Sequence, residues 1–124
     1  MYKQDKSNKY LNEQPMNNQT VQEGKTIAII SYITVIGTLI AYIMNQNKQN
    51  HFASFHIRQA IGLFTLGLLV NFLQRYTDMG WLDMVLGITV FILWIFGLVG
   101  AIQGEEKRVP FLGDQFQEWF RNIH

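Results

Sequence analysis

The chain has 124 residues, of which 48% are hydrophobic and 15% charged, and its formal net charge is +1. So small a net charge argues against nucleic-acid binding, which usually needs a strongly basic face. The absence of cysteine excludes disulfides, thiolate catalysis and cysteine-ligated metals. We therefore expect no nucleic-acid partner, no metal and no other cofactor.

Residues 1–24 are polar and rich in asparagine, glutamine and lysine. A segment of this composition buries too little apolar surface to offset the conformational entropy that it loses on ordering. We therefore predict a disordered tail over residues 1–24. A transmembrane domain over residues 25–104 and a charged, amphipathic segment over residues 105–124 follow it.

The run from Thr26 to Met44 contains no charged side chain. At about 1.5 Å per helical residue it is long enough to cross roughly 30 Å of bilayer hydrocarbon, so it predicts a first transmembrane helix. Small or weakly polar residues recur along it at three- and four-residue spacing, which places them on one face for packing against other helices. These residues are Ser31, Thr34, Thr38 and Ala41.

A second helix is predicted from Asn50 to Gln74, with Asn50 as its N-cap. Its apolar part, residues 60–73, covers only about 21 Å, so we expect its first turns to lie at the membrane interface. His56 begins a face of small and polar residues that could form an inward-pointing polar lane. The other residues on this face are Ala60, Gly67 and Asn71.

A third transmembrane helix is predicted over the uncharged run from Met84 to Gln103, with Asp78 as its cap and Trp81 at the level of the lipid headgroups. Near its end, small residues at i, i+3, i+4 and i+7 form a face that another backbone can approach closely. They are Gly97, Gly100, Ala101 and Gly104.

After the charged residues 105–108, a short helix is predicted from Asp114 onward, with aromatic and aliphatic residues on one side. Such a helix is typical of an element that lies on the membrane surface, although a frayed tail is the alternative. The predicted fold class is therefore all-α: an integral membrane helical bundle of three transmembrane helices plus a short C-terminal amphipathic interfacial helix.

The start of the second predicted helix carries the most distinctive motif, which consists of Phe52, Phe55, His56, Arg58 and Gln59. In one interpretation this motif contacts a partner or takes part in a conformational change. In the other it is structural, with Arg58 reaching lipid phosphates while His56 and Gln59 bind free backbone carbonyls of a neighbouring helix. His51 and His56 point about 140° apart on a helix, so we expect no shared metal site.

The sequence pairs no nucleophile with a base, and no phosphate-binding glycine loop follows a strand. No pair of carboxylates lies inside the predicted spans either. We therefore predict no catalytic residue and no enzymatic activity.

Three groups of residues form a wider pattern over about residues 24–113: Ser31 and Tyr32 with Gly37, the stretch FASFHIRQA at residues 52–60, and Gly104 and Glu105 followed by Pro110 and Gly113. This pattern resembles small bacterial membrane proteins that are similar to the plastid inner-envelope import component, the Tic-twenty type. The resemblance implies an all-helical integral membrane fold and a role near protein translocation or membrane-complex assembly.

Two functions are compatible with these features. The first is a non-enzymatic membrane subunit or assembly factor, embedded in the lipid bilayer, with a membrane-protein partner or further copies of itself. The second is a homo-oligomeric pore or carrier for ions or small solutes, which needs a continuous polar lane. In both cases we expect a multi-pass protein of the bacterial inner (cytoplasmic) membrane.

Overall fold

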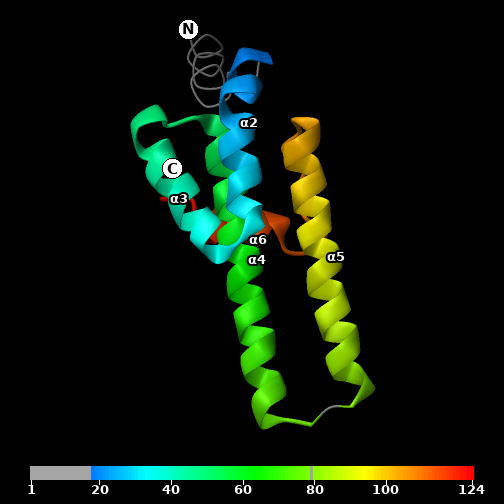
Figure 1. The fold of residues 1–124 in the computed structure, drawn as a ribbon. Helices are drawn as coiled ribbons and strands as arrows, with labels where there is room; N and C mark the ends of the chain where they lie inside the picture. The colour runs from blue at the N-terminus through cyan, green and yellow to red at the C-terminus, as the bar shows by residue number, and fades with distance from the viewer. Residues whose placement is uncertain (1–17, 79) are drawn as a thin grey trace, which may run out of the picture.

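The computed structural model describes residues 18–78 and 80–124. Within these two ranges the chain forms five α-helices and no strand (Figure 1), which confirms the all-α prediction. Because the first helix begins at Asn18, the predicted end of the tail at residue 24 is wrong, and the rest of the tail lies outside the described residues. The helices are α2 (Asn18–Ile33), α3 (Val35–Lys48), α4 (His51–Tyr76), α5 (Trp81–Gln103) and α6 (Gly113–Trp119).

α4 and α5 form a long antiparallel hairpin (Figure 1). As predicted, Asn50 caps α4, because its side chain accepts a hydrogen bond from the backbone N–H of Ala53 at 3.0 Å. The prediction that Asp78 caps α5 is wrong, since the N-cap position is Gly80. Gly80 has φ 62°, which glycine tolerates, and the Asp78 carboxylate accepts a 3.4 Å hydrogen bond from its N–H within the turn.

α4 and α5 are the two described helices that are long and apolar enough to cross a membrane. With 26 and 23 residues they extend about 39 and 35 Å, more than the roughly 30 Å of bilayer hydrocarbon. In the outer half of α4 and α5, away from the other helices, several large apolar side chains are each more than half exposed. Examples are Leu68, Phe72, Ile88 and Phe91. Such a surface suits lipid rather than water as its solvent.

The prediction of one continuous helix from Thr26 to Met44 is wrong, because the chain folds back at Thr34 (Figure 1). Thr34 has an extended backbone, with φ −150° and ψ 171°, and α3 packs against α2 instead of continuing it. With 16 and 14 residues, α2 and α3 extend only about 24 and 21 Å, less than the hydrocarbon thickness. The described chain therefore has two candidate membrane spans rather than the predicted three.

Two hydroxyl groups and a glycine stabilise the break between α2 and α3. Thr34 Oγ1 accepts a 2.9 Å hydrogen bond from the N–H of Gly37, and Thr38 Oγ1 donates to the carbonyl of Ser31 at 2.7 Å. A Cβ atom on Gly37 would overlap the carbonyl oxygen of Ile30, so α3 can turn back this tightly only with glycine at that position. Residues predicted as one packing face thus form the turn between two helices.

Thr34→Ala is expected to lower the free energy of unfolding by about 1 kcal/mol, because the Gly37 N–H loses its acceptor at a helix end. Thr34→Ser keeps the hydroxyl oxygen, so its free energy of unfolding should remain close to that of the natural protein. Titration with SDS in mixed micelles, followed by tryptophan fluorescence, measures the difference. Equal stability of the two variants would contradict the capping role.

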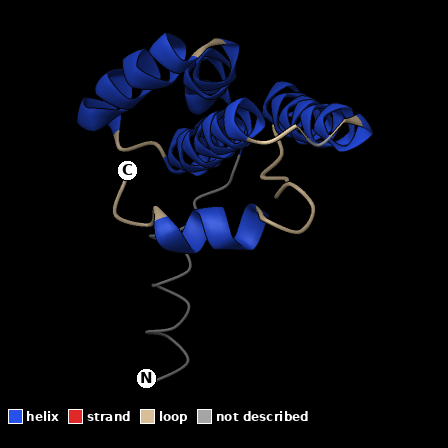
Figure 2. Cartoon of the chain, turned by 90° about the horizontal axis from the view of Figure 1, so that it is seen from below, coloured by secondary structure: helices blue, strands red, loops and turns tan. Residues whose placement is uncertain are grey.

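α6 lies across the fold, on the side of α4 opposite to α2 and α3 (Figure 2). The ring of Phe116 packs directly on Gly62 of α4, where any larger residue would overlap it. The predicted C-terminal helix is therefore present and begins at Gly113. The larger core cluster lies around the first half of α4 and consists of Ala28, Tyr32, Phe52, Ala60, Leu63, Leu93, Ala101, Val109 and Phe116.

Candidate functional site

A buried polar cluster lies where α2, α4 and the end of α5 meet, and His56 is at its centre. The His56 side chain is fully buried, and its Nε2 atom lies 2.9 Å from the carbonyl oxygen of Glu105. Because a carbonyl can only accept, Nε2 carries the proton, and Nδ1 accepts from the hydroxyl of Tyr32 at 2.6 Å. The contacts of His56 therefore specify one neutral tautomer.

Gln59, one turn further along α4, extends this cluster to the segment that connects α5 with α6. We call this segment, residues 105–112, the strap. The amide nitrogen of Gln59 donates to the Tyr32 hydroxyl at 3.0 Å and to the Lys107 carbonyl at 2.9 Å. Its amide oxygen accepts from the N–H of Val109 at 2.9 Å. His56 and Gln59 thus hold the strap against α4.

Aromatic rings enclose the His56 side chain. The ring centroids of Phe52 and Phe55 lie 4.7 and 5.0 Å from that of His56, and both pairs meet edge to face. Both phenylalanines are buried, with at most 3% of their surface exposed. Four of the five motif residues, Phe52, Phe55, His56 and Gln59, therefore line an internal site.

The predicted glycine face of α5 lies against the same cluster. A Cβ atom on Gly97 would lie 2.8 Å from the ring of Tyr32, and one on Gly100 would lie 3.1 Å from the side chain of Lys107 in the strap. Gly104 ends α5 with φ 75°, the left-handed conformation that glycine adopts readily at helix ends. This face allows α2 and the strap to approach α5 closely.

The other predicted packing residues differ in burial. The buried ones are Ser31, Thr38, Ala41 and Ala101. Gly67 and Asn71 lie in the outer half of α4, where a Cβ atom on Gly67 would be 3.7 Å from the nearest atom of Val90 and Asn71 is exposed. The structure therefore does not bring His56 and Asn71 together into the polar lane that their spacing suggested.

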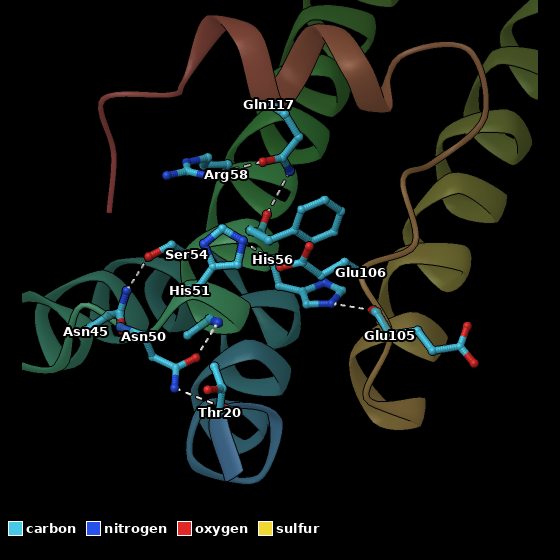
Figure 3. A network of polar contacts seen from close by, with 12 residues as sticks. Thr20, Asn45, Asn50, His51, Ser54, His56, Arg58, Glu105, Glu106 and Gln117 are labelled. Atoms are coloured by element: carbon cyan, nitrogen blue, oxygen red, sulfur yellow. Dashed lines mark hydrogen bonds and ion pairs between the residues drawn. The ribbon is translucent and has the colours of Figure 1, made fainter. Parts of the chain in front are cut away.

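Arg58 connects α4 to the C-terminal segment (Figure 3). Its Nε atom donates to the Ile123 carbonyl at 2.7 Å, and a terminal guanidinium nitrogen lies 3.5 Å from the side-chain oxygen of Gln117 in α6. Gln117 in turn donates to the carbonyl of Phe55 at 2.9 Å. These acceptors within the chain give Arg58 a role in positioning α6, which the sequence did not indicate.

A second polar cluster joins the neighbouring ends of α2, α3 and α4 (Figure 3). Asn45 donates to the Ser54 hydroxyl at 2.8 Å and accepts from the backbone N–H of Asn50 at 2.9 Å. The side chain of Asn50 donates to the carbonyl of Thr20 at 3.0 Å. The sequence did not indicate the roles of Thr20 and Ser54, nor the partners of Tyr32. A tyrosine in an apolar run is nevertheless a signal, because a buried hydroxyl group needs a hydrogen-bond partner.

Glu106 of the strap has an unusual setting for a carboxylate. Its Oε2 atom lies 3.4 Å from Nε2 of His51, within ion-pair range, yet accepts no hydrogen bond from the described part of the chain. Burial raises the pKa of Glu106 to about 7, and the positive charges of Arg108 and Arg58 oppose that rise.

The Glu106 carboxyl binds its proton more tightly in the folded chain than in the unfolded chain, where the pKa is 4.5. Its contribution to stability is therefore complete below pH 4.5 and is lost as the pH rises through about 7. We expect the stability of Glu106→Gln to fall less than that of the natural protein as the pH rises. Unfolding midpoints in SDS at about pH 5 and about pH 8 provide the comparison, and a parallel pH dependence in both proteins would refute the assignment.

Sequence comparison finds relatives of this chain in an archaeon. Over 86 residues it is 30% identical to the UPF0132 membrane protein MJ1443 of Methanocaldococcus jannaschii, covering 68% of this chain and 76% of that relative. The chain belongs to the UPF0132 family of membrane proteins. The UPF0132 membrane protein MJ1527 of the same organism is 29% identical over 78 residues, which cover 61% of this chain and 56% of that relative.

No family model and no solved structure matches the UPF0132 chain. Both relatives are named membrane proteins, in agreement with the two long apolar helices α4 and α5. Their names carry no link to the Tic-twenty type, and they come from an archaeon rather than a bacterium. The comparisons thus support a small membrane protein family without supporting the import role.

Proposed function

We propose that this UPF0132 chain is a non-enzymatic, multi-pass integral protein of the cytoplasmic membrane that acts as a subunit or assembly factor of a larger membrane complex. Its partners are the lipid bilayer and either another membrane protein or further copies of itself. Protein translocation is the process that the resemblance of residues 52–60 suggests. Support comes from how this motif is bonded and from which side chains remain exposed.

The observation that carries the proposal is that the polar groups of the motif are bonded within the chain. His56 uses both ring nitrogens, and Gln59 uses both its amide nitrogen and its amide oxygen. A catalytic or transport residue needs a proton or a lone pair that the substrate can reach. The bonding of these two side chains supports a structural role, in which they hold the strap in place.

Two aromatic side chains near the strap contacts are highly exposed. Phe111 in the strap is 95% exposed and has φ 70°, a left-handed conformation that bulky residues rarely adopt. Trp119 of α6 is 65% exposed. Aromatic residues are enriched both at protein interfaces and at the headgroup level of membranes. They are the side chains through which the strap and α6 would contact a partner.

The pore or carrier receives no comparable support from the described residues. A pore needs a continuous polar lane, but the hydroxyl of Thr38 donates to a backbone carbonyl and that of Thr34 caps α3. Asn71 is exposed on the outer half of α4. These polar side chains are therefore either bonded to backbone groups or exposed on the outer half of α4, and they supply no continuous lane.

Photocrosslinking combined with flux measurements tests the subunit role. A photoreactive amino acid at Phe111 should give a crosslinked product of defined size in intact cells, whereas the same label at Leu68, which is 67% exposed on α4, should not. Liposomes that contain the purified protein should retain dye and potassium as well as empty liposomes do. Leakage of dye or potassium, without a crosslinked product from position 111, would overturn the proposal in favour of the pore.

A secretory precursor arrested during export tests the translocation role separately. A crosslink from position 111 to this precursor is the expected result. A product with a resident membrane protein alone would remove translocation from the proposal and leave the subunit role in place.

A further inference from the structure

α2 and α3 form a hairpin that is polar at its open end and apolar at its closed end. At the open end, where Asn50 bonds the carbonyl of Thr20, the exposed polar residues are Asn18, Gln19, Gln22, Glu23, Gln46, Asn47 and Lys48. At the closed end, the residues on either side of Thr34 are apolar and more than half exposed; they are Ile33, Val35 and Ile36. This gradient is the one expected of a hairpin whose closed end is solvated by lipid.

The outer face of α3 is an apolar stripe. Ile36, Ile40 and Ile43 follow one another at helical spacing and are between 47% and 70% exposed. The stripe continues onto the outer half of α4, because Leu39 of α3 and Leu68 of α4 line the same apolar groove. Two surfaces that are continuous and equally apolar require the same solvent.

Three backbone groups at the closed end are bonded to side chains of the protein. Besides the cap at Thr34, the hydroxyl of Thr38 donates to the Ser31 carbonyl, and the indole N–H of Trp94 in α5 donates to the Tyr32 carbonyl, both at 2.7 Å. The last carbonyls of a helix have no partner within it, so they bond side chains or water. In hydrocarbon an unpaired backbone group is costly, so a helix break at that depth needs partners of this kind.

The contact with Trp94 indicates how deep the closed end lies. Trp94 precedes Gln103, the last residue of α5, by nine residues, which corresponds to about 13 Å along the helix axis. The charged residues of the strap follow Gln103 almost directly, so they mark the membrane surface. The closed end is then near the middle of a hydrocarbon layer roughly 30 Å thick.

We infer that α2 and α3 form a re-entrant hairpin, which enters and leaves the membrane on the same side, with lipid acyl chains covering the outer face of α3. The chain then crosses the bilayer twice, through α4 and α5. This inference rests on the proposed multi-pass placement of these two helices. It puts Gln22, Asn47 and Asn122 on one side of the membrane and Thr77 on the other.

Single cysteines test this topology, because the natural chain contains none. From one side of oriented vesicles, a membrane-impermeant maleimide should label Gln22→Cys, Asn47→Cys and Asn122→Cys, and from the other side Thr77→Cys. All four positions are exposed. Labelling of Gln22→Cys and Asn47→Cys from opposite sides would overturn the re-entrant hairpin alone. Labelling of all four from one side would refute the spans, and with them the proposed function.

Spin labels test the depth of the closed end. A nitroxide at Val35→Cys should be accessible to oxygen but not to a water-soluble nickel complex, as at the matched control Ile88→Cys in α5. A nitroxide at Asn47→Cys should show the reverse. Nickel accessibility at Val35→Cys equal to that at Asn47→Cys would place the hairpin outside the hydrocarbon and overturn the inference. The same result at Ile88→Cys would instead refute the membrane span.

Discussion

Gln59→Leu is expected to lower the free energy of unfolding by about 3 kcal/mol or more, because a buried group that loses its hydrogen-bond partner costs about 1–3 kcal/mol. Leucine is similar in size but cannot bond the Lys107 carbonyl, the Val109 N–H or the Tyr32 hydroxyl. The three losses are coupled, since one side chain makes all the contacts, so they should not simply add. The strap should detach from α4.

Gln115→Leu is the matched control, because it makes the same substitution at an exposed position of α6. We expect it to change stability by no more than about 0.5 kcal/mol. SDS titration measures both variants, and limited proteolysis of residues 105–112 reports directly on release of the strap. Similar stability and similar proteolysis of the two variants would mean that Gln59 does not hold the strap.

Gly62→Val is expected to displace α6 from α4 and to cost about 1–3 kcal/mol, the usual range for overpacking a tight contact. A Cβ atom at position 62 would overlap the ring of Phe116, and the two methyl groups of valine enlarge that conflict. Phe116 is 4% exposed, so its ring has little free space into which it can move. Faster proteolysis after residue 112 would report the loss of α6 from its site.

Gly87→Val provides the control, because it introduces the same residue within α5 at a position where a Cβ atom would meet nothing within 4 Å. When Phe116 is first changed to alanine, adding Gly62→Val should cost less stability than it does beside Phe116, since the smaller alanine leaves room for the valine. If Gly62→Val and Gly87→Val behave alike, the contact between α4 and α6 is not tight.

Features that depend only on residues close together in the sequence could be predicted from it. The uncharged run at Met84–Gln103 and the apolar part of α4 indicated two long helices, because a helix in lipid needs about 20 successive apolar residues whatever surrounds it. The cap at Asn50 is equally local, since its side chain bonds an N–H only three residues away. The short C-terminal helix followed from its amphipathic pattern.

The break at Thr34 could not be predicted in the same way. An uncharged run of this length is compatible with a straight helix, and threonine or glycine within it is tolerated in membranes. The chain folds back because α3 can pack on α2 and α4, and because Trp94, 62 residues away in sequence, bonds a carbonyl next to the break. The number of candidate spans thus depends on contacts that hydropathy does not contain.

By itself, then, the sequence determined that this chain is helical and apolar enough for lipid, and it identified Phe55 to Gln59 as its distinctive polar segment. Only the tertiary structure decided what that segment bonds. The partners of His56 and Gln59 in the strap are backbone groups at residues 105, 107 and 109, and every residue except proline carries both kinds of group regardless of its side chain. A contact with the main chain leaves no mark in the amino-acid sequence, so it becomes visible only when the helices are packed.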